Sequence, residues 1–271
     1  MQVAFWSVVH GQASTTSNMI AVSLMTALEY RMKLLITHNH FEKSTLESSL
    51  INRRYLKKGL TDLEDTGIDA LSRFVKFNNI DKDSIVNYTT TLLKNRLDLL
   101  IGTSNTNREL YFNNLGKIIQ TIFNSAQEYY DILFIDVCSG YNELSRKIVD
   151  ESDLVVVNLN QNINVLDDFF QNHKDLLDKC VVLISMYDDN SRFNYKMISR
   201  KYGLKKGIGL IPYCREFGDA CNEGKAVDFF MRNLRANKDD SNYYFIKEVR
   251  KSVQMILEKI DIDISLKKIG D

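Results

Sequence analysis

The strongest constraint on the fold lies near the start of the chain, where an apolar run, a loop of small residues and an apolar helix follow one another. Residues 3–9 are β-type, residues 8–18 read VVHGQASTTSN, and the spacing of apolar residues predicts a helix from Ser17 to about Arg31. This order is typical of a phosphate-binding loop, in which backbone N–H groups at a helix N-terminus cradle the phosphate. Small residues matter more there than any one side chain.

Short apolar runs recur along the chain, with helical patterns between most of them. They are residues 3–9, 34–36, 97–101, 132–135, 154–159, 181–186 and 208–211. Near-continuous apolar strands separated by helices are typical of a parallel sheet covered on both faces. The sequence therefore predicts a doubly wound α/β fold, with a mostly parallel sheet of seven to eight strands flanked by helices. In such sheets ligands bind outside the carboxyl ends of the strands, where the loop at 10–16 is expected.

The chain of 271 residues has no linker rich in Pro, Gly or Ser, so we expect one domain over residues 1–271. The stretch at about 41–96 is less regular and is predicted to be a helical insertion or cap, with helices around 66–77 and 81–95. Near the C-terminus, residues 245–260 carry apolar residues at helical spacing. This pattern favours a helix docked on the sheet over one lying on a membrane, because its polar face is not richly basic.

The net charge and the cysteines bear on which partners the protein binds and on the compartment in which it works. The 35 Lys and Arg residues equal the 35 Asp and Glu residues, which gives no whole-molecule case for binding nucleic acid or an anionic membrane. A basic cluster at Arg53, Arg54, Lys57 and Lys58 could touch DNA phosphates, although a solvated helix end is the simpler interpretation. Four scattered cysteines and the absence of a long apolar run indicate a reduced, cytoplasmic setting.

Two later segments carry a family resemblance. Residues 130–140 read YDILFIDVCSG, and residues 211–225 read IPYCREFGDACNEGK. Together with the first loop, and in this order, they resemble the motifs of the MinD/ParA superfamily of P-loop ATPases over nearly the whole chain. The first matches the pattern YDxxxIDxxxG, whose aspartate contacts the Mg²⁺ shell. The second matches IPxxxxxxxAxxxGKxV, whose proline lies beside the adenine.

The resemblance implies ATP or ADP with Mg²⁺ as the cofactor. It places Mg²⁺ at Thr16 and Asp136 and the base near Pro212. The residues that it assigns to the nucleotide are His10, Gly11, Gln12, Ala13, Ser14, Thr15, Thr16, Ser17, Asp136, Gly140, Ser185, Met186 and Pro212.

Three charged groups of the superfamily are absent from this chain. The lysine that reaches across the dimer aligns with His10, the P-loop lysine with Thr15, and the water-activating carboxylate with Asn39. An asparagine cannot accept a proton as a carboxylate does, and a cation on the transferred phosphoryl group normally stabilises the transition state. We therefore expect hydrolysis to be very slow or absent, and we assign no catalytic residue.

A phosphate-binding loop that has lost its lysines resembles the loop of the TadZ localisation factors. These proteins position the Flp-type pilus machinery. The resemblance implies a dimeric localisation or assembly scaffold that is recruited to a pole, or to a membrane-bound secretion or pilus complex, through partner proteins. The alternative is an active ParA-type partition ATPase with nonspecific DNA binding. A third interpretation is an interaction protein with an empty pocket.

Three histidines and a cysteine follow predicted strands and could converge at one edge of the sheet. They are His10, His38, His40 and Cys138. Imidazole and thiolate are ligands that zinc accepts, so a zinc site is one interpretation. The more ordinary interpretation is that the imidazoles form hydrogen bonds with phosphate or with the loop backbone.

Overall fold

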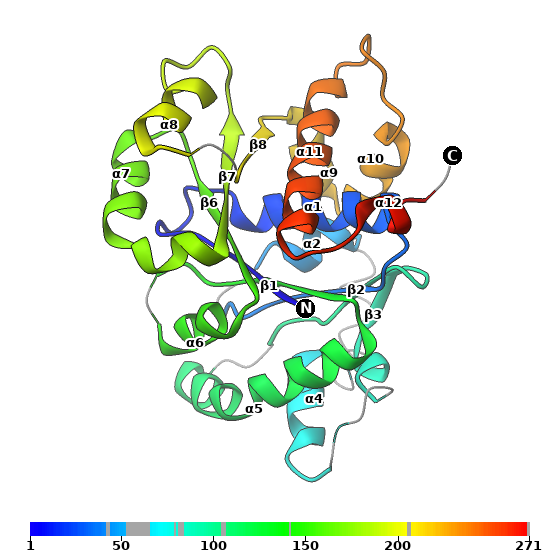
Figure 1. Ribbon diagram of the computed structural model, residues 1–271. Helices are drawn as coiled ribbons and strands as arrows, with labels where there is room; N and C mark the ends of the chain where they lie inside the picture. The colour runs from blue at the N-terminus through cyan, green and yellow to red at the C-terminus, as the bar shows by residue number, and fades with distance from the viewer. Residues whose placement is uncertain are drawn as a thin grey trace.

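A sheet of eight strands runs through the centre of the molecule (Figure 1). The computed structural model describes residues 1–41, 44–52, 66–78, 80, 84–103, 107–140, 142–204 and 207–269. The strand order is β3-β4-β2-β5-β1-β6-β7-β8, and neighbours pair in parallel except β3 and β4. The strands are β1 (Gln2–Trp6), β2 (Leu34–His38), β3 (Thr90–Leu93), β4 (Leu97–Leu99), β5 (Ile132–Asp136), β6 (Leu154–Leu159), β7 (Cys180–Tyr187) and β8 (Ile208–Pro212). The predicted doubly wound, mostly parallel sheet is confirmed.

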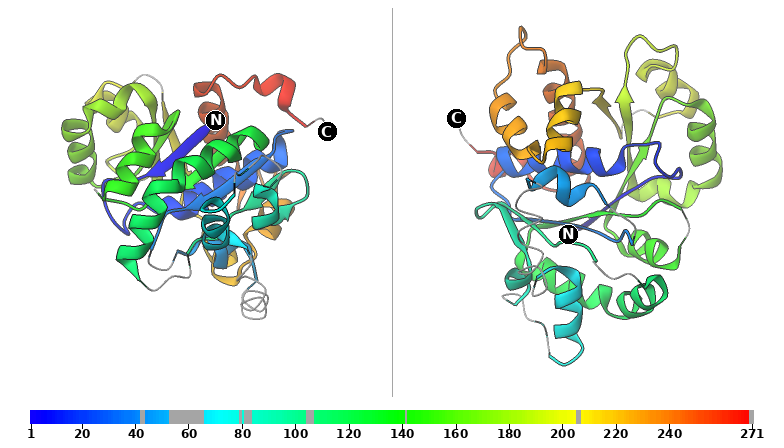
Figure 2. Two further views of the ribbon diagram at one scale, coloured as in Figure 1. Left: turned by 90° about the horizontal axis from the view of Figure 1, so that it is seen from below. Right: turned by 180° about the vertical axis from the view of Figure 1, so that it is seen from behind.

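Helices cover both faces of this sheet, as Figures 1 and 2 show. One face carries α1 (Thr15–Glu29), α2 (Leu46–Leu50), α9 (Arg215–Glu223), α10 (Ala226–Asn233) and α11 (Tyr243–Lys259). The other carries α4 (Gly67–Val75), α5 (Arg108–Tyr129), α6 (Glu143–Glu151), α7 (Ile163–Asn172) and α8 (Tyr195–Tyr202). Shorter turns are the 3₁₀ segments η2 (Ile85–Tyr88) and η3 (Lys174–Lys179) and the helix α12 (Ile264–Lys267). Within the described residues, no helix combines the length and the hydropathy needed to span a bilayer.

The alternation of side chains along each strand divides the core into two layers. Val3 and Phe5 of β1 pack under α1 and α11, whereas Ala4 and Trp6 face the layer of α4 to α8. Residues of the four central strands β1, β2, β5 and β6 are buried throughout. This explains why those segments read as unbroken apolar runs. The apolar side of α11 joins the first layer, which confirms that the C-terminal helix docks on the sheet.

The predicted helix around 81–95 is wrong, because the described residues there form only the short 3₁₀ segment η2 before a strand begins. Residues 90–93 form β3, which pairs antiparallel with β4 and extends the sheet at its edge. The turn between the two strands is closed by Arg96 N–H donating to Leu93 O (2.9 Å), and Asn95 has a φ of +60°. Asparagine tolerates this left-handed backbone better than most residues, so it favours a hairpin turn here.

The predicted helix around 66–77 is present as α4. The basic cluster at Arg53, Arg54, Lys57 and Lys58 lies outside the described residues.

The contact between α11 and β8 depends on a residue without a side chain. A Cβ atom on Gly209 would lie 2.5 Å from Ser252 Oγ and 2.7 Å from Leu183 Cδ2. Ser252 Oγ also donates a hydrogen bond to the backbone oxygen of Leu210 (3.2 Å), which holds the helix against this edge strand. The close approach leaves no room for a methyl group.

We predict that Gly209→Ala lowers the free energy of unfolding by about 1–3 kcal/mol, because α11 must move away from β8. The matched control is Gly218→Ala in α9, where a Cβ atom would have no neighbour within 4 Å. That change should raise stability by about 0.5–1 kcal/mol, because alanine loses less backbone entropy in a helix. Urea unfolding of both variants tests this. Equal effects of the two substitutions would contradict the packing at β8.

Candidate functional site

The loop between β1 and α1 lies at the carboxyl edge of the sheet, where the sequence predicts it. Helix α1 begins at Thr15, two residues earlier than expected, and Ser14 is its N-cap residue without a side-chain cap. Gly11 and Ser14 both have positive φ values, of +70° and +48°. The N–H groups of the first turn of a helix have no intrahelical partners. With no cap from Ser14, they can donate to an anion.

A cluster of polar side chains connects this loop and the start of α1 to strands β6 and β7. Asn18, in the first turns of α1, donates from Nδ2 to Asn158 Oδ1 on β6 and to Ser185 Oγ on β7, both at 2.7 Å. Asn160, just after β6, donates to the backbone oxygen of Gln12 (3.1 Å). The loop is therefore tied to the ends of two strands that lie far from it in the sequence.

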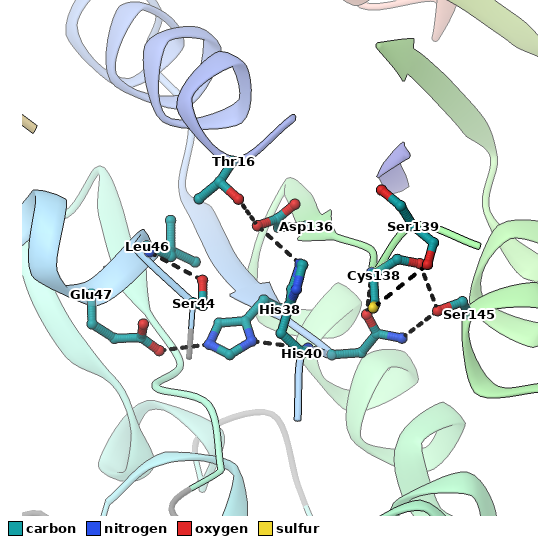
Figure 3. Close-up of polar contacts among 11 residues, drawn as sticks. Thr16, His38, His40, Ser44, Leu46, Glu47, Asp136, Cys138, Ser139 and Ser145 are labelled. Atoms are coloured by element: carbon teal, nitrogen blue, oxygen red, sulfur yellow. Dashed lines mark hydrogen bonds and ion pairs between the residues drawn. The ribbon is translucent and has the colours of Figure 1, made fainter. Parts of the chain in front are cut away.

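Thr16 and Asp136 meet directly under the loop (Figure 3). Thr16 Oγ1 donates a hydrogen bond of 2.6 Å to Asp136 Oδ2. Asp136 is the last residue of β5 and is fully buried. Its second oxygen, Oδ1, has no hydrogen-bond partner among the described residues. The carboxylate is thus held through one oxygen, with the other still able to accept a donor.

His40 forms an ion pair with the same carboxylate. Its Nε2 lies 3.3 Å from Asp136 Oδ2, and the side chain is 18% exposed. Burial opposes protonation of the ring, but the interactions with Asp136 and Cys138 outweigh it and raise the pKa of His40 to about 10. A protonated His40 places a positive charge beside Asp136, at a site where the chain lacks the P-loop lysine.

Asn39 is buried and its amide is engaged within the protein. It donates from Nδ2 to Ser145 Oγ (3.0 Å), and its Oδ1 accepts from the backbone N–H of Cys138 (2.6 Å). Ser145 Oγ in turn donates to Cys138 O (3.0 Å). Asn39 thereby joins the end of β2 to the segment that follows β5. Both polar atoms of the Asn39 amide are therefore engaged within the protein.

His38 and Glu47 connect the sheet to α2. His38 Nδ1 accepts a hydrogen bond from the backbone N–H of His40 (3.1 Å), so its Nε2 carries the proton and donates to Glu47 Oε1 (2.7 Å). Gly102 N–H donates to the same oxygen (3.0 Å), and a Cβ atom on Gly102 would overlap the His38 ring. Burial favours the neutral acid, but the bonds from His38 and Gly102 prevail and lower the pKa of Glu47.

The remaining predicted site residues lie along the same edge of the sheet. His10 and Gln12 are exposed in the loop, and Gly140 follows β5 with a φ of +91°. Met186, near the end of β7, is 53% exposed with a φ of +48°, and Pro212 ends β8.

The alternative of a zinc site at His10, His38, His40 and Cys138 is not supported by the structure. No three His, Cys, Asp or Glu side chains in the described part of the chain are arranged to hold a metal ion. The backbone interpretation of the histidines is confirmed for His38, which accepts the N–H of His40.

Sequence reasoning missed Asn18, Asn158 and Ser145 as parts of the site. Asn158 stands within the otherwise apolar strand LVVVNL, and Asn18 opens the apolar stretch of α1. Buried polar side chains need hydrogen-bond partners, so an isolated asparagine in an apolar run was the available signal.

Comparisons with known proteins identify relatives of the fold. Neither a family model nor a curated protein matches the sequence. A ParA family ATPase from Chlorobium tepidum matches the structure with a TM-score of 0.72 at 13% identity, covering 93% of this chain and 98% of that one. Septum site-determining protein MinD from Pyrococcus horikoshii, complexed with Mg-ADP, matches with a TM-score of 0.64 at 14% identity, covering 97% and 100%.

A plasmid partition protein from Borrelia burgdorferi, bound to AMPPNP, matches with a TM-score of 0.62 at 15% identity, covering 95% and 98%. The chain therefore has the fold of the MinD and ParA ATPases.

We predict that Glu47→Gln destabilises the protein in a pH-dependent way. Because the pKa of Glu47 is lower in the folded state than its ordinary value of 4.5, its contribution is present above pH 4.5 and is lost as the pH falls through the folded pKa. The loss should be about 1–3 kcal/mol at pH 7 and should shrink below pH 4.5.

Urea unfolding of wild type and variant between pH 3 and pH 7 measures this difference. Glu223→Gln is the control, because Glu223 pairs with Lys225 on the exposed surface and should change stability much less. A Glu47→Gln effect that stays constant over this range would contradict a stabilising role for the ionised Glu47 carboxylate.

Proposed function

We propose that this chain is a MinD/ParA-like protein that binds ATP or ADP at residues 10–17 and hydrolyses it very slowly or not at all. The observation that carries this proposal is the hydrogen bond from Thr16 to Asp136 beneath the loop. It joins, within the fold of the MinD and ParA ATPases, the two side chains that the sequence motifs assign to the phosphate end of a nucleotide. The Mg-ADP and AMPPNP named for two of the similar structures support an adenine nucleotide as the ligand.

The phosphates would lie across residues 11–17. Backbone N–H groups of the first turn of α1 would donate to them, aided by the positive end of the helix dipole. The base would lie near Pro212 and the exposed side chain of Met186, at the ends of β8 and β7. Ser185 would support this site indirectly, because its hydroxyl accepts the hydrogen bond from Asn18 at the start of α1.

Slow hydrolysis follows from the groups that the site lacks. Thr15 offers no charge where a lysine would contact the transferred phosphoryl group. Asn39 has no basic oxygen, and its amide is already bonded to Ser145 and Cys138. Binding through backbone N–H groups needs neither of these functions. The proposed protein is therefore a nucleotide-binding pseudo-ATPase.

A dimeric scaffold is the role we propose for such a protein, as in the TadZ localisation factors. His10 is exposed in the loop, where a lysine would reach the nucleotide of the partner subunit. An imidazole is a weaker cation than lysine at neutral pH, so a dimer would rest on apolar and hydrogen-bonded surface and depend little on nucleotide. The scaffold would act in the cytoplasm and reach a pole, or a membrane-bound secretion or pilus complex, through partner proteins.

We predict that ATP turnover is at background, because the site has neither the lysine nor the carboxylate of an active ATPase. Calorimetric titration with ATP and ADP, paired with a phosphate-release assay, measures binding and turnover on the same sample. Asn39→Asp alone should not restore turnover, because Thr15 still provides no cation and the new carboxylate cannot donate to Ser145.

The double variant Thr15→Lys, Asn39→Asp is the matched comparison, because it supplies the P-loop lysine and the water-activating carboxylate together. Wild-type turnover of about 1 per second, within the ordinary range for enzymes, would overturn the pseudo-ATPase proposal. It would favour the alternative, an active partition ATPase that binds DNA nonspecifically.

A further inference from the structure

The outer edge of β8 is open to another strand. β8 ends the strand order of the sheet and pairs with β7. In this parallel pairing Gly209 and Ile211 form the hydrogen bonds to β7. The N–H and C=O groups of Ile208 and Leu210 therefore point away from β7. In the described part of the chain, their one hydrogen bond is donated by Ser252 Oγ to Leu210 O (3.2 Å). An unpaired strand edge is a template for pairing with another chain.

This edge lies in a groove between α8 and α11 (Figures 1 and 2). The cavity, which we call the β8 groove, has a volume of about 650 Å³, within the range of ligand-binding pockets. Its walls include Tyr244, Glu248 and Lys251 on the α11 side and Tyr187, Tyr195 and Lys196 on the other side. The backbone N–H of Tyr195 donates to Tyr187 Oη (2.9 Å). Tyr244 Oη donates to Asp189 Oδ2 (2.7 Å). These bonds hold both walls in place, so the groove is preformed.

The walls of the β8 groove determine what can reach the strand edge. A folded second copy carries the same two helices beside its own β8, and these would have to pack against α8 and α11 before the edges could pair. An extended segment has no such helices and fits between the walls. One residue of a segment parallel to β8 would donate its N–H to Ile208 O and accept the N–H of Leu210, both of which Ser252 leaves free.

A buried carboxylate lies where one side chain of such a segment would point. Residues paired across two strands share a face of the sheet, and a Cβ atom on Gly209 would lie 2.5 Å from Ser252 Oγ on α11. The residue opposite Gly209 would therefore point to the α11 side. Glu248 lies one turn of α11 from Ser252 and also lines the groove.

Glu248 favours a basic side chain at this position. Its side chain is only 9% exposed, and its Oε1 accepts a hydrogen bond from Lys251 Nζ (2.7 Å). No hydrogen bond reaches its Oε2 within the described residues. A guanidinium or ammonium group would donate a charge-assisted bond to this oxygen. Lys196 and Lys251 are exposed, so both can turn to solvent when such a group enters.

We propose that the β8 groove binds an extended segment of a partner protein. The segment pairs in parallel with β8 and places an arginine or lysine opposite Gly209, where its cation contacts Glu248 Oε2. The inference goes beyond the proposed function and does not rest on it, since no groove residue is among those assigned to the nucleotide. Failure of ADP to bind would leave it standing.

Random heptapeptides displayed on phage and selected on the wild-type protein supply the probes. We expect the recovered peptides to share an arginine or lysine at one position, with neighbours that favour extended structure. In calorimetric titration of the synthesised peptides, Glu248→Gln should weaken binding at least about tenfold, because the charge-assisted bond is lost. Glu258→Gln makes the same change on an exposed residue of α11 outside the groove and should stay within about twofold of wild type. Recovery of no specific peptide, or of peptides that bind Glu248→Gln as tightly as wild type, would overturn the inference.

Amide exchange measured by nuclear magnetic resonance on the wild-type complex tests the strand pairing. The bound peptide should slow exchange at Ile208 and Leu210, whose N–H groups face away from β7, at least about tenfold. Gly209 and Ile211 already donate to β7 and should change much less. If Glu248→Gln fails to fold, this pattern decides alone. Protection of Leu210 then supports the inference, and peptide binding without it overturns the inference.

Discussion

The hydrogen bond between Thr16 and Asp136 is the contact on which the candidate site depends. It joins the first turn of α1 to the end of β5, 120 positions away in the sequence. The sheet makes this contact possible, because β1 and β5 pair in parallel and so end at the same edge. The loop that precedes α1 then lies directly above a buried carboxylate. A phosphate in that loop requires positive charge or N–H donors between itself and Asp136.

Asn39, which aligns with the water-activating carboxylate of the MinD/ParA motif, is engaged within the protein. Asn39 binds Ser145 and Cys138 and holds two strand ends together. His40, next to it, contacts Asp136. A site that had merely lost its catalytic groups would leave Asp136 without compensation, and a buried, unpaired carboxylate is costly. The internal contacts thus stabilise the ends of β2 and β5 beneath the loop.

Seven of the eight strands were predictable, because strands buried on both faces read as apolar runs. β3 was not, since its residues at 90–93 lie at the edge, only partly buried, and their spacing also fits a helix. The antiparallel pairing with β4 makes this segment a strand rather than a helix. Within the site, the motifs predicted that Thr16 and Asp136 are neighbours. They could not predict that His40 faces Asp136 while His38 faces Glu47, because the packing of α2 and Gly102 sets these ring directions.

Amide hydrogen exchange with and without ADP tests the central claim most directly, because the proposed ligand binds mainly through backbone N–H groups. We expect ADP to slow exchange at residues 10–18, with smaller changes after β5 and near Pro212. Protection confined to other parts of the chain, with residues 10–18 unaffected, would contradict it and would place any nucleotide away from the Thr16–Asp136 contact.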